Sequence, residues 1–256
     1  MLMKNMHTLN TNIRTHGLNT YNIMEIHNHF IALKTYEWWY KPLPGDIVVD
    51  LGASVGAFSC YALDSGADEV YVVEPNVDLL KNAIFNVSPY MYTDAPNKPK
   101  LHFINKAIGE SQDRADHVFQ SNMFPFRRNI DVISWDKFIE ENKIEHIDFL
   151  KVNIQGGEYD IFTEERLEFF KTKVRHIAIM LYLDNDNRLF AAEHMVNTFL
   201  KHFLPVNEEN KTDMMHQKVR TQNWNIFEEL MYNGGIRAIT QNPQGPKILP
   251  IYITNW

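Results

Sequence analysis

Short apolar runs alternate along most of the chain with segments of helical spacing. This alternation is typical of a mostly parallel β-sheet that is covered by α-helices on its faces. The pattern predicts five strands, over Ile47–Leu51, Val70–Glu74, Leu101–Asn105, Ile147–Ile154 and Ile177–Leu183. The last run is almost continuously apolar, as expected of a strand that is buried on both faces.

Helices are expected between these strands. One extends from about Val55 to Ser65 and ends at Gly66, because glycine tolerates the left-handed conformation that follows many helices. A second begins after Asn76, whose side chain is of the type that caps helix N-termini. Residues 87–99 contain three prolines and predict a loop. Later segments of helical spacing are Ser134–Asn142, Phe190–Phe203 and Trp224–Tyr232.

The C-terminal pattern predicts a closing antiparallel pair of strands, over Ile236–Thr240 and Ile248–Thr254. No shift in composition marks a domain boundary. We therefore expect one doubly wound α/β domain over residues 44–256, preceded by a helical or flap-like segment over residues 1–43.

Composition narrows the functional classes. The 256 residues include one cysteine, Cys60, which excludes an internal disulfide or a multi-cysteine metal site. The net charge of −7 argues against non-specific coating of nucleic acid. The longest apolar run, Ile177–Leu183, is far shorter than the roughly 20 residues that span a bilayer. The first twenty residues lack the apolar stretch of a signal peptide, so we expect a cytoplasmic protein that binds neither nucleic acid nor membrane.

The most informative segment is Val48–Gly56, where a buried strand enters a glycine-bearing turn and then a helix. This context places a ligand beyond the carboxyl end of the strand, beside a helix N-terminus. A dinucleotide fold would use G-x-G-x-x-G, but here Ser54 occupies the second glycine position, and its Cβ would obstruct a pyrophosphate. The turn has no lysine, which excludes a P-loop. A phosphate-free ligand such as S-adenosylmethionine suits the turn better.

An acid follows at the end of the next strand. Glu74 lies 24 residues after Asp50, which places a carboxylate where it can accept hydrogen bonds from ribose hydroxyls. Asp50 would orient the turn and meet the methionine end of the ligand through water. The alternative is that Gly52 and Gly56 merely form a tight connection and Glu74 is a surface acid.

A second polar segment follows the predicted strand Ile147–Ile154. Asn153 and Gln155 lie two residues apart, so on an extended chain they point to the same side, toward the mouth of the same cleft. Gly156 then opens a helix that carries Glu158 in its first turn. The alternative is that the amides are hydrogen-bonding groups at a strand end and that Glu158 is an ordinary acid in the first turn of a helix.

Together, the segments Asp50–Gly56, Val72–Asn76 and Phe149–Tyr159 resemble, in order and spacing, the FkbM family of class I S-adenosylmethionine-dependent methyltransferases. Asn105–Gly109 is similar to the exit of the third strand in that family. The resemblance covers about Pro44 to Leu183, a little over half of the chain.

The resemblance implies a Rossmann-like methyltransferase fold, with a seven-stranded, mostly parallel sheet whose last strand is antiparallel. It implies that S-adenosylmethionine is the cofactor, with Glu74 on the ribose and the turn Asn105–Ala107 near the adenine. The residues that would hold the cofactor are Asp50, Gly52, Ala53, Ser54, Gly56, Glu74, Asn76, Asn105, Lys106 and Ala107. The acceptor in such families is commonly a hydroxyl, which implies O-methylation of a sugar, a glycan or a small natural product.

The sequence departs from the family pattern on the acceptor side. Asn153 and Gln155 stand where the first two acids are expected, whereas Glu158 retains the third. An amide accepts hydrogen bonds, but it is neither a general base nor a good divalent-metal ligand, so we expect no metal. Tyr182 lies in a strand that often carries a glutamate in the family. Glu158 is the candidate base, with Asn153 and Gln155 as the other candidate catalytic residues.

Three hypotheses follow. The first is a methyltransferase whose acceptor is a small molecule or glycan, framed by residues 109–129, where Arg127 and Arg128 could hold an anionic or sugar-like group. The alternative, which we favour for that segment, is a solvated loop whose phenylalanines anchor it to the core. The second hypothesis is a binding module that retains the cofactor pocket but has lost the chemistry, because Asn153 and Gln155 carry no charge. The third, a nicotinamide-dependent oxidoreductase, is disfavoured by Ser54.

Overall fold

The structure is a computed structural model that describes residues 40–92, 98–110, 130–183, 186–203, 219–221 and 248–255. Most of the predicted N-terminal segment of residues 1–43 lies outside the described residues, as do residues 111–129, the predicted helix Trp224–Tyr232 and the predicted strand Ile236–Thr240. The chain forms two compact units, Met1–Asn105 and Lys106–Trp256.

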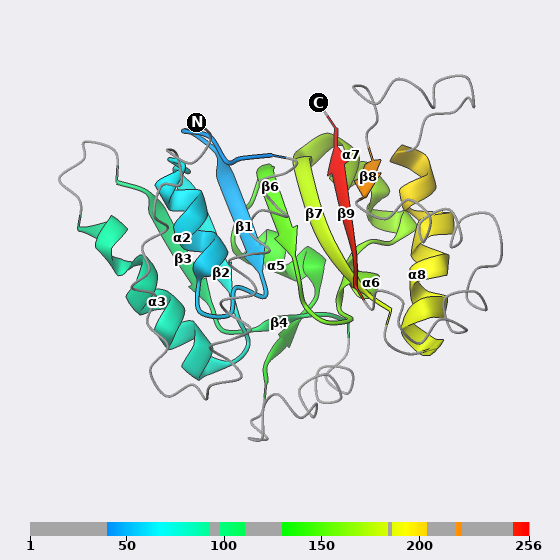
Figure 1. Cartoon of the computed structure of the whole chain (residues 1–256), viewed down its shortest axis with the longest axis horizontal. Helices are drawn as coiled ribbons and strands as arrows, with labels where there is room; N and C mark the ends of the chain where they lie inside the picture. Colours follow the sequence, from blue (N-terminus) through cyan, green and yellow to red (C-terminus); the bar gives the residue numbers. More distant parts are fainter. Residues whose placement is uncertain are drawn as a thin grey trace, which may run out of the picture. The chain divides into compact units, whose positions relative to one another are not determined.

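In the first unit, strands and helices alternate along the chain. Its strands have the order β3-β2-β1 and are parallel, with Val49 of β1 beside Tyr71 of β2 and Tyr71 beside His102 of β3. The elements are β1 (Ile47–Leu51), α2 (Ala57–Asp64), β2 (Glu69–Val73), α3 (Val77–Met91) and β3 (Lys100–Ile104). Helices α2 and α3 lie side by side on one face of these strands (Figure 1). This is expected because both connections between parallel strands are right-handed and both move in the same direction along the sheet.

Helix α3 is longer than the sequence predicts. It continues through Pro89 to Met91, whereas the prolines from Val87 onward predict a loop. Pro89 removes one backbone donor near the end of the helix. The hydroxyl of Ser88 donates to the carbonyl oxygen of Phe85 at 2.8 Å, which satisfies the acceptor that a non-proline residue 89 would have used. The cost of the proline is therefore small at this position.

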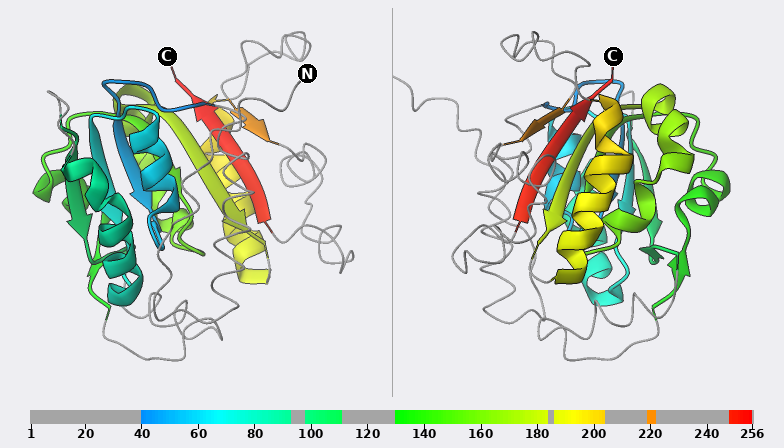
Figure 2. Two further views of the ribbon diagram at one scale, coloured as in Figure 1. Left: turned by 60° about the vertical axis from the view of Figure 1, so that its left-hand side comes forward. Right: turned by 90° about the vertical axis from the view of Figure 1, so that its right-hand side faces the viewer.

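The second unit contains the strands β6, β7, β9 and β8, in that order, and a separate parallel pair of β4 with β5. Strand β7 is parallel to β6, whereas β9 is antiparallel to both of its neighbours. Helix α8 runs alongside β7 (Figure 2). The strands are β4 (Ala107–Ile108), β5 (Val132–Ile133), β6 (Ile147–Val152), β7 (Val174–Tyr182), β8 (Val219–Thr221) and β9 (Ile248–Thr254). The helices are α5 (Trp135–Glu141), α6 (Glu158–Ile161), α7 (Leu167–Lys173) and α8 (Asp186–Thr198), with 3-10 turns at Glu164–Arg166 and Leu200–Phe203.

The fold class predicted from the sequence is confirmed. The chain has an α/β fold whose strand pairs are mostly parallel, with its last strand antiparallel. The five predicted strands are present, with ends that differ from the expected ones by three residues at most.

Aromatic side chains fill much of the core of the second unit. The ring of Trp135 stacks on that of Phe170 at a centroid distance of 5.3 Å, and Phe170 contacts Phe162 at 4.8 Å and Phe199 at 5.4 Å. Such pairs contribute beyond their buried area. They join helices α5 and α7 to the segment that follows α6 and to the end of α8.

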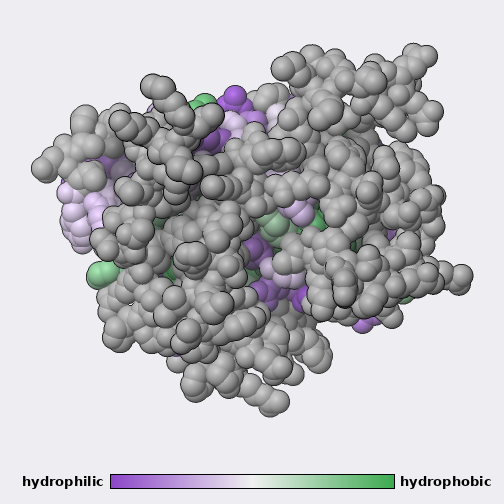
Figure 3. Space-filling model, in the orientation of Figure 1, coloured by the Kyte–Doolittle hydropathy of each residue, from purple (hydrophilic) through white to green (hydrophobic). Residues whose placement is uncertain are grey.

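The described surface mixes polar and apolar groups. On the face drawn in Figure 3, hydrophilic and hydrophobic colours are interspersed among the described residues. No helix within the described part of the chain is long and apolar enough to cross a membrane.

Candidate functional site

The turn after β1 is built from left-handed backbone. Gly52, Ser54 and Gly56 have φ angles of 76°, 53° and 79°, and the backbone N–H groups of Gly52 and Ala53 donate to the carbonyl oxygen of Val73, each at 3.0 Å. At Gly56 a Cβ atom would lie 3.0 Å from Cβ and 3.1 Å from Cα of Ala83 on α3. Glycine is therefore required at position 56 both by the backbone and by close packing of α3.

Glu74 connects this turn to the start of α3. Its Oε2 atom accepts from the backbone N–H of Ser54 at 2.9 Å, and its Oε1 atom accepts from the backbone N–H of Asn76 at 2.8 Å. The side chain is only 5 % exposed. The two motifs singled out in the sequence thus meet at one carboxylate, and the interpretation of Glu74 as an ordinary surface acid does not fit this burial.

Two asparagines fix the surroundings of Glu74. The Oδ1 atom of Asn76 accepts from the backbone N–H of Asp78 at 2.9 Å and of Leu79 at 3.3 Å, so Asn76 is the predicted helix cap. The Nδ2 atom of Asn105, just after β3, donates to the carbonyl oxygens of Glu74 at 2.9 Å and Pro75 at 2.8 Å. The ends of β2 and β3 are thereby joined.

Asp50 lies beneath the turn. Its side chain is fully buried, and its Oδ2 atom accepts from the hydroxyl of Ser59 on α2 at 2.7 Å. This hydrogen bond connects β1 to α2 beneath the turn, and the role of Asp50 toward the cofactor stays a prediction.

A ribose and a cationic group fit the chemistry of these residues in the first unit. An ionised carboxylate accepts up to about four hydrogen bonds, so ribose hydroxyls can share Glu74 with the two backbone N–H groups. Ser54 places a side chain where a dinucleotide turn needs none, which disfavours a pyrophosphate. Nothing in this donor set disagrees with S-adenosylmethionine.

In the second unit, the turn after β6 is also left-handed. Gln155 has a φ angle of 56° and Gly156 of 121°, and both are partly exposed, as is Asn153. The Oδ1 atom of Asn153 accepts from the hydroxyl of Tyr182 at the end of β7, at 2.7 Å. The amide that stands where the family pattern expects an acid is thus paired with a tyrosine at the end of β7.

Glu158 is the buried acid of this turn. Its side chain is 0 % exposed, its Oε2 atom accepts from the backbone N–H of Gly156, and its Oε1 atom has no hydrogen-bond partner among the described residues. Burial raises its pKa to about 7, against the opposing effects of the backbone N–H groups and the charge of Arg188. A carboxyl with this pKa exchanges a proton near neutral pH.

Gly157 is required by packing rather than by its backbone angle. A Cβ atom there would lie 2.8 Å from Cδ1 of Ile154 and 2.9 Å from the carbonyl oxygen of Ile108. We expect Gly157→Ala to destabilise the fold by about 1–3 kcal/mol, because the backbone of β4 would have to shift. The matched control is Gly109→Ala, where a Cβ atom meets only ordinary contacts of 3.6 Å and 3.8 Å. Denaturant unfolding checks this prediction, and equal stability of the two variants would contradict it.

The remaining predicted residues lie at the start of the second unit. Lys106 pairs with Glu141 of α5 at 3.1 Å, and Ala107 begins β4 opposite Val132. The predicted turn is thus shorter than Asn105–Ala107, since Ala107 is part of a strand.

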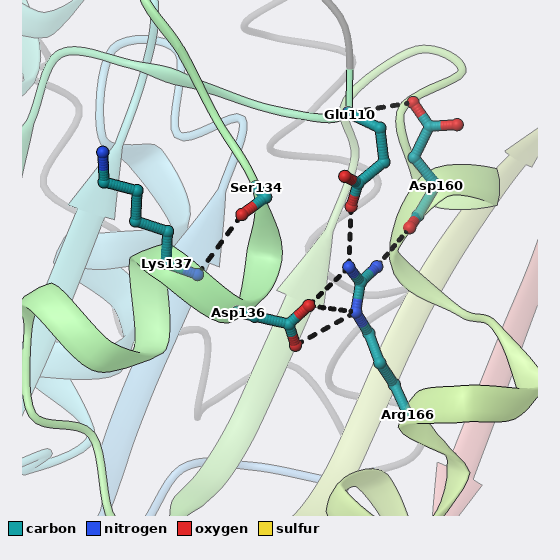
Figure 4. A network of polar contacts seen from close by, with 6 residues as sticks. All are labelled: Glu110, Ser134, Asp136, Lys137, Asp160 and Arg166. Carbon is teal, nitrogen blue, oxygen red and sulfur yellow. Dashed lines mark hydrogen bonds and ion pairs between the residues drawn. The ribbon is translucent and has the colours of Figure 1, made fainter.

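Arg166 is a residue that the sequence analysis did not identify. Figure 4 shows its guanidinium between Asp136, Glu110 and the backbone oxygen of Asp160, with Nη2 at 2.6 Å from Asp136 and 2.7 Å from Glu110. Although burial acts in the opposite direction, the hydrogen bonds that Arg166 donates to Asp136 and Glu110 raise its pKa. The contacts fix α6, which carries Glu158, against the start of α5.

Arg188 of α8 is a second residue that was missed. Its Nη2 atom donates to the carbonyl oxygen of Gln155, and its guanidinium lies 5.6 Å from the ring centroid of Tyr182.

Within the residues that the structure describes, no group of three or more histidine, cysteine, aspartate or glutamate side chains is arranged to hold a metal ion.

Comparison with known proteins gives a family match. Residues 50–219 match the family model described as the methyltransferase FkbM domain. No curated protein matches the chain.

Among solved structures, the chain is similar to a methyltransferase FkbM from Methylobacillus flagellatus KT, with 21 % identity and a TM-score of 0.42 over 61 % of this chain and 38 % of that one. The chain thus spans well under half the length of that relative. Fibrillarin from Aeropyrum pernix, solved with S-adenosyl-L-methionine, has 12 % identity and a TM-score of 0.39 over 84 % of this chain and 69 % of that one. TrmK from M. capricolum, solved with S-adenosyl-homocysteine, has 11 % identity and a TM-score of 0.35 over 84 % and 64 %.

Proposed function

The chain belongs to the FkbM methyltransferase family, and on that premise we propose that it transfers the methyl group of S-adenosylmethionine to a hydroxyl oxygen of a sugar, a glycan or a small natural product. The observation that carries the proposal is the carboxylate of Glu74. It joins the turn at Ser54 to the helix start at Asn76, which is the placement a ribose-binding acid needs.

In this proposal, the first unit holds the cofactor. The turn from Gly52 to Gly56 contacts its methionine end, Glu74 accepts from the ribose, and Asp50 keeps the turn in register from beneath. Asn76, Asn105, Lys106 and Ala107 complete the cofactor-binding set, the last three on the adenine side. Ala53 contributes through its backbone.

The chemistry of transfer makes modest demands on the second unit. S-adenosylmethionine supplies a methyl group already activated by its sulfonium, so the chief task of the protein is to align the acceptor oxygen. Asn153 and Gln155 offer polar groups that can orient a hydroxyl. With the cofactor supplying the methyl group, Glu158 would accept the proton of the acceptor hydroxyl at Oε1, the oxygen without a hydrogen-bond partner among the described residues.

A second candidate function is a cofactor-binding module without transferase activity. It is favoured by the two neutral amides at positions 153 and 155 and by the complete burial of Glu158. The two candidates differ in whether methyl transfer occurs at all, not in whether the cofactor binds.

Restoring the acids separates these candidates. We expect the unaltered chain to transfer labelled methyl groups to at least one member of a panel of sugars and polyols. The variant Asn153→Asp with Gln155→Glu keeps an oxygen that can accept from Tyr182, so it should remain folded. Transfer by the restored variant alone would favour the binding module, and transfer by neither protein would contradict O-methylation.

A further inference from the structure

We propose that Arg188 of helix α8 is a positioning residue for the turn from Asn153 to Glu158: it holds the left-handed backbone of that turn and faces the Glu158 carboxyl as its neighbouring cation. The functional side of this inference, that the turn serves methyl transfer, rests on the proposed function. Arg188 lies outside every motif that resembles the family.

The backbone of the turn needs an external support. Gln155 and Gly156 are consecutive left-handed residues, with φ angles of 56° and 121°. This conformation is unfavourable for glutamine, because its Cβ approaches the carbonyl oxygen. The Nη2 atom of Arg188 donates to the carbonyl oxygen of Gln155. This bond ties the strained residue to α8.

Packing brings the same guanidinium against Gly156. A Cβ atom on Gly156 would lie 3.3 Å from Nε and 3.4 Å from Nη2 of Arg188. The absence of a side chain at position 156 thus leaves the space in which the guanidinium lies. Gly156 and Arg188 form a matched pair, although 32 positions separate them in the sequence.

Tyrosine contacts fix Arg188 in turn. Its guanidinium lies over the ring of Tyr182, whose hydroxyl donates to Asn153 at 2.7 Å. The hydroxyl of Tyr159, one residue beyond Glu158, donates to the carbonyl oxygen of Tyr182 at 2.8 Å. These contacts connect α8 to both ends of the turn through the end of β7. A long-range bond from a planar, rigid guanidinium can therefore hold the turn in one geometry.

Electrostatics gives the same assignment. Two charged side chains act on the buried carboxyl of Glu158: Arg188 from α8, which favours the ionised form, and Asp160 from α6, which disfavours it. Burial dominates and raises the pKa of Glu158 to about 7. Without the Arg188 charge the pKa would rise further, and the carboxyl would be a poorer proton acceptor at neutral pH.

Carbon-13 NMR of the full chain, labelled at the glutamate carboxyl carbon, tests this inference. The resonance of Glu158 is assigned as the one missing from Glu158→Gln. In Arg188→Gln we expect its titration midpoint to rise by about one pH unit, because a neighbouring cation is lost. In Arg188→Lys, which keeps the charge, the titration midpoint of Glu158 should move less. Hydrogen exchange at the backbone N–H of Gly156 should become faster, because the guanidinium that binds the carbonyl oxygen of Gln155 is lost. The matched control is Arg175→Gln, which removes an arginine near the opposite, amino end of β7 and should leave both readouts unchanged.

The inference would be overturned if both Arg188 variants had the same Glu158 titration midpoint and the same hydrogen-exchange rate at Gly156 as the unaltered chain. If Arg188→Gln does not fold, Arg188→Lys alone decides through the exchange rate. Calorimetry with S-adenosylhomocysteine on the unaltered chain reports separately on the proposed function, because Arg188 belongs to the second unit and the titration requires no cofactor.

Discussion

Glu74→Ala is expected to weaken binding of S-adenosylhomocysteine by about 1.5–3 kcal/mol, or roughly 10- to 150-fold, the usual size for a hydrogen bond to a charged group. The physical reason is twofold. The ribose loses its charged acceptor, and the backbone N–H groups of Ser54 and Asn76 lose the oxygens to which they donate. Titration calorimetry on the full chain measures the change.

Two further variants sharpen this result. Glu74→Gln retains one oxygen but replaces the other with a donor, which would face a backbone N–H, so its affinity should fall between those of the alanine variant and the unaltered chain. Glu69→Ala is the matched control. Glu69 lies at the other end of β2, where it contacts Tyr71 and His102. It should leave the dissociation constant unchanged, and an unchanged constant in Glu74→Ala would remove Glu74 from the site.

Glu158→Gln is expected to change how the free energy of unfolding depends on pH. In the folded chain, burial raises the pKa of Glu158 from 4.5 to about 7. Below pH 4.5 the carboxyl is protonated in both states, and its contribution to stability is fully present. Between pH 4.5 and 7 unfolding releases a proton, so stability falls as the pH rises through this window. A pKa difference of this size corresponds to about 3 kcal/mol.

The glutamine variant has no such titration. Denaturant unfolding at pH 4.5, 6 and 8 should therefore show that Glu158→Gln gains stability relative to the unaltered chain as the pH rises, by about 3 kcal/mol over the full window. Glu141→Gln is a suitable control, because the exposed Glu141 pairs with Lys106 and its pKa is lowered, not raised. If the free energy of unfolding changed with pH in the same way for Glu158→Gln and the unaltered chain, the raised pKa of Glu158 in the folded chain would be contradicted.

Local sequence patterns predicted the elements that carry the cofactor half of the site. The apolar runs fixed β1 and β2, the glycines fixed the turn, and the acid at the end of β2 followed from the spacing. That Glu74 lies near the turn could be predicted because parallel strands bring their carboxyl ends to one edge of a sheet. The helical end of α3 was not predicted, because the loss of one donor at Pro89 depends on the hydroxyl of Ser88.

The acceptor half was harder to predict because its contacts are long-range. Asn153 and Gln155 were recognised from their local motif, but the partner of Asn153 is Tyr182, 29 positions away. Arg188 and Arg166 lie in helical segments without a motif, and their contacts with Gln155 and Asp136 depend on how those helices pack. The complete burial of Glu158 was likewise set by packing, since a first-turn helix acid is ordinarily exposed.

Titration calorimetry of the full chain with S-adenosylmethionine, S-adenosylhomocysteine and NAD tests most directly whether the turn at Gly52–Gly56 and Glu74 bind an adenosyl cofactor without phosphates. We expect one-site binding of both adenosyl compounds, weakened in Glu74→Ala, and no binding of NAD. Tight binding of NAD without binding of either adenosyl compound would contradict this expectation.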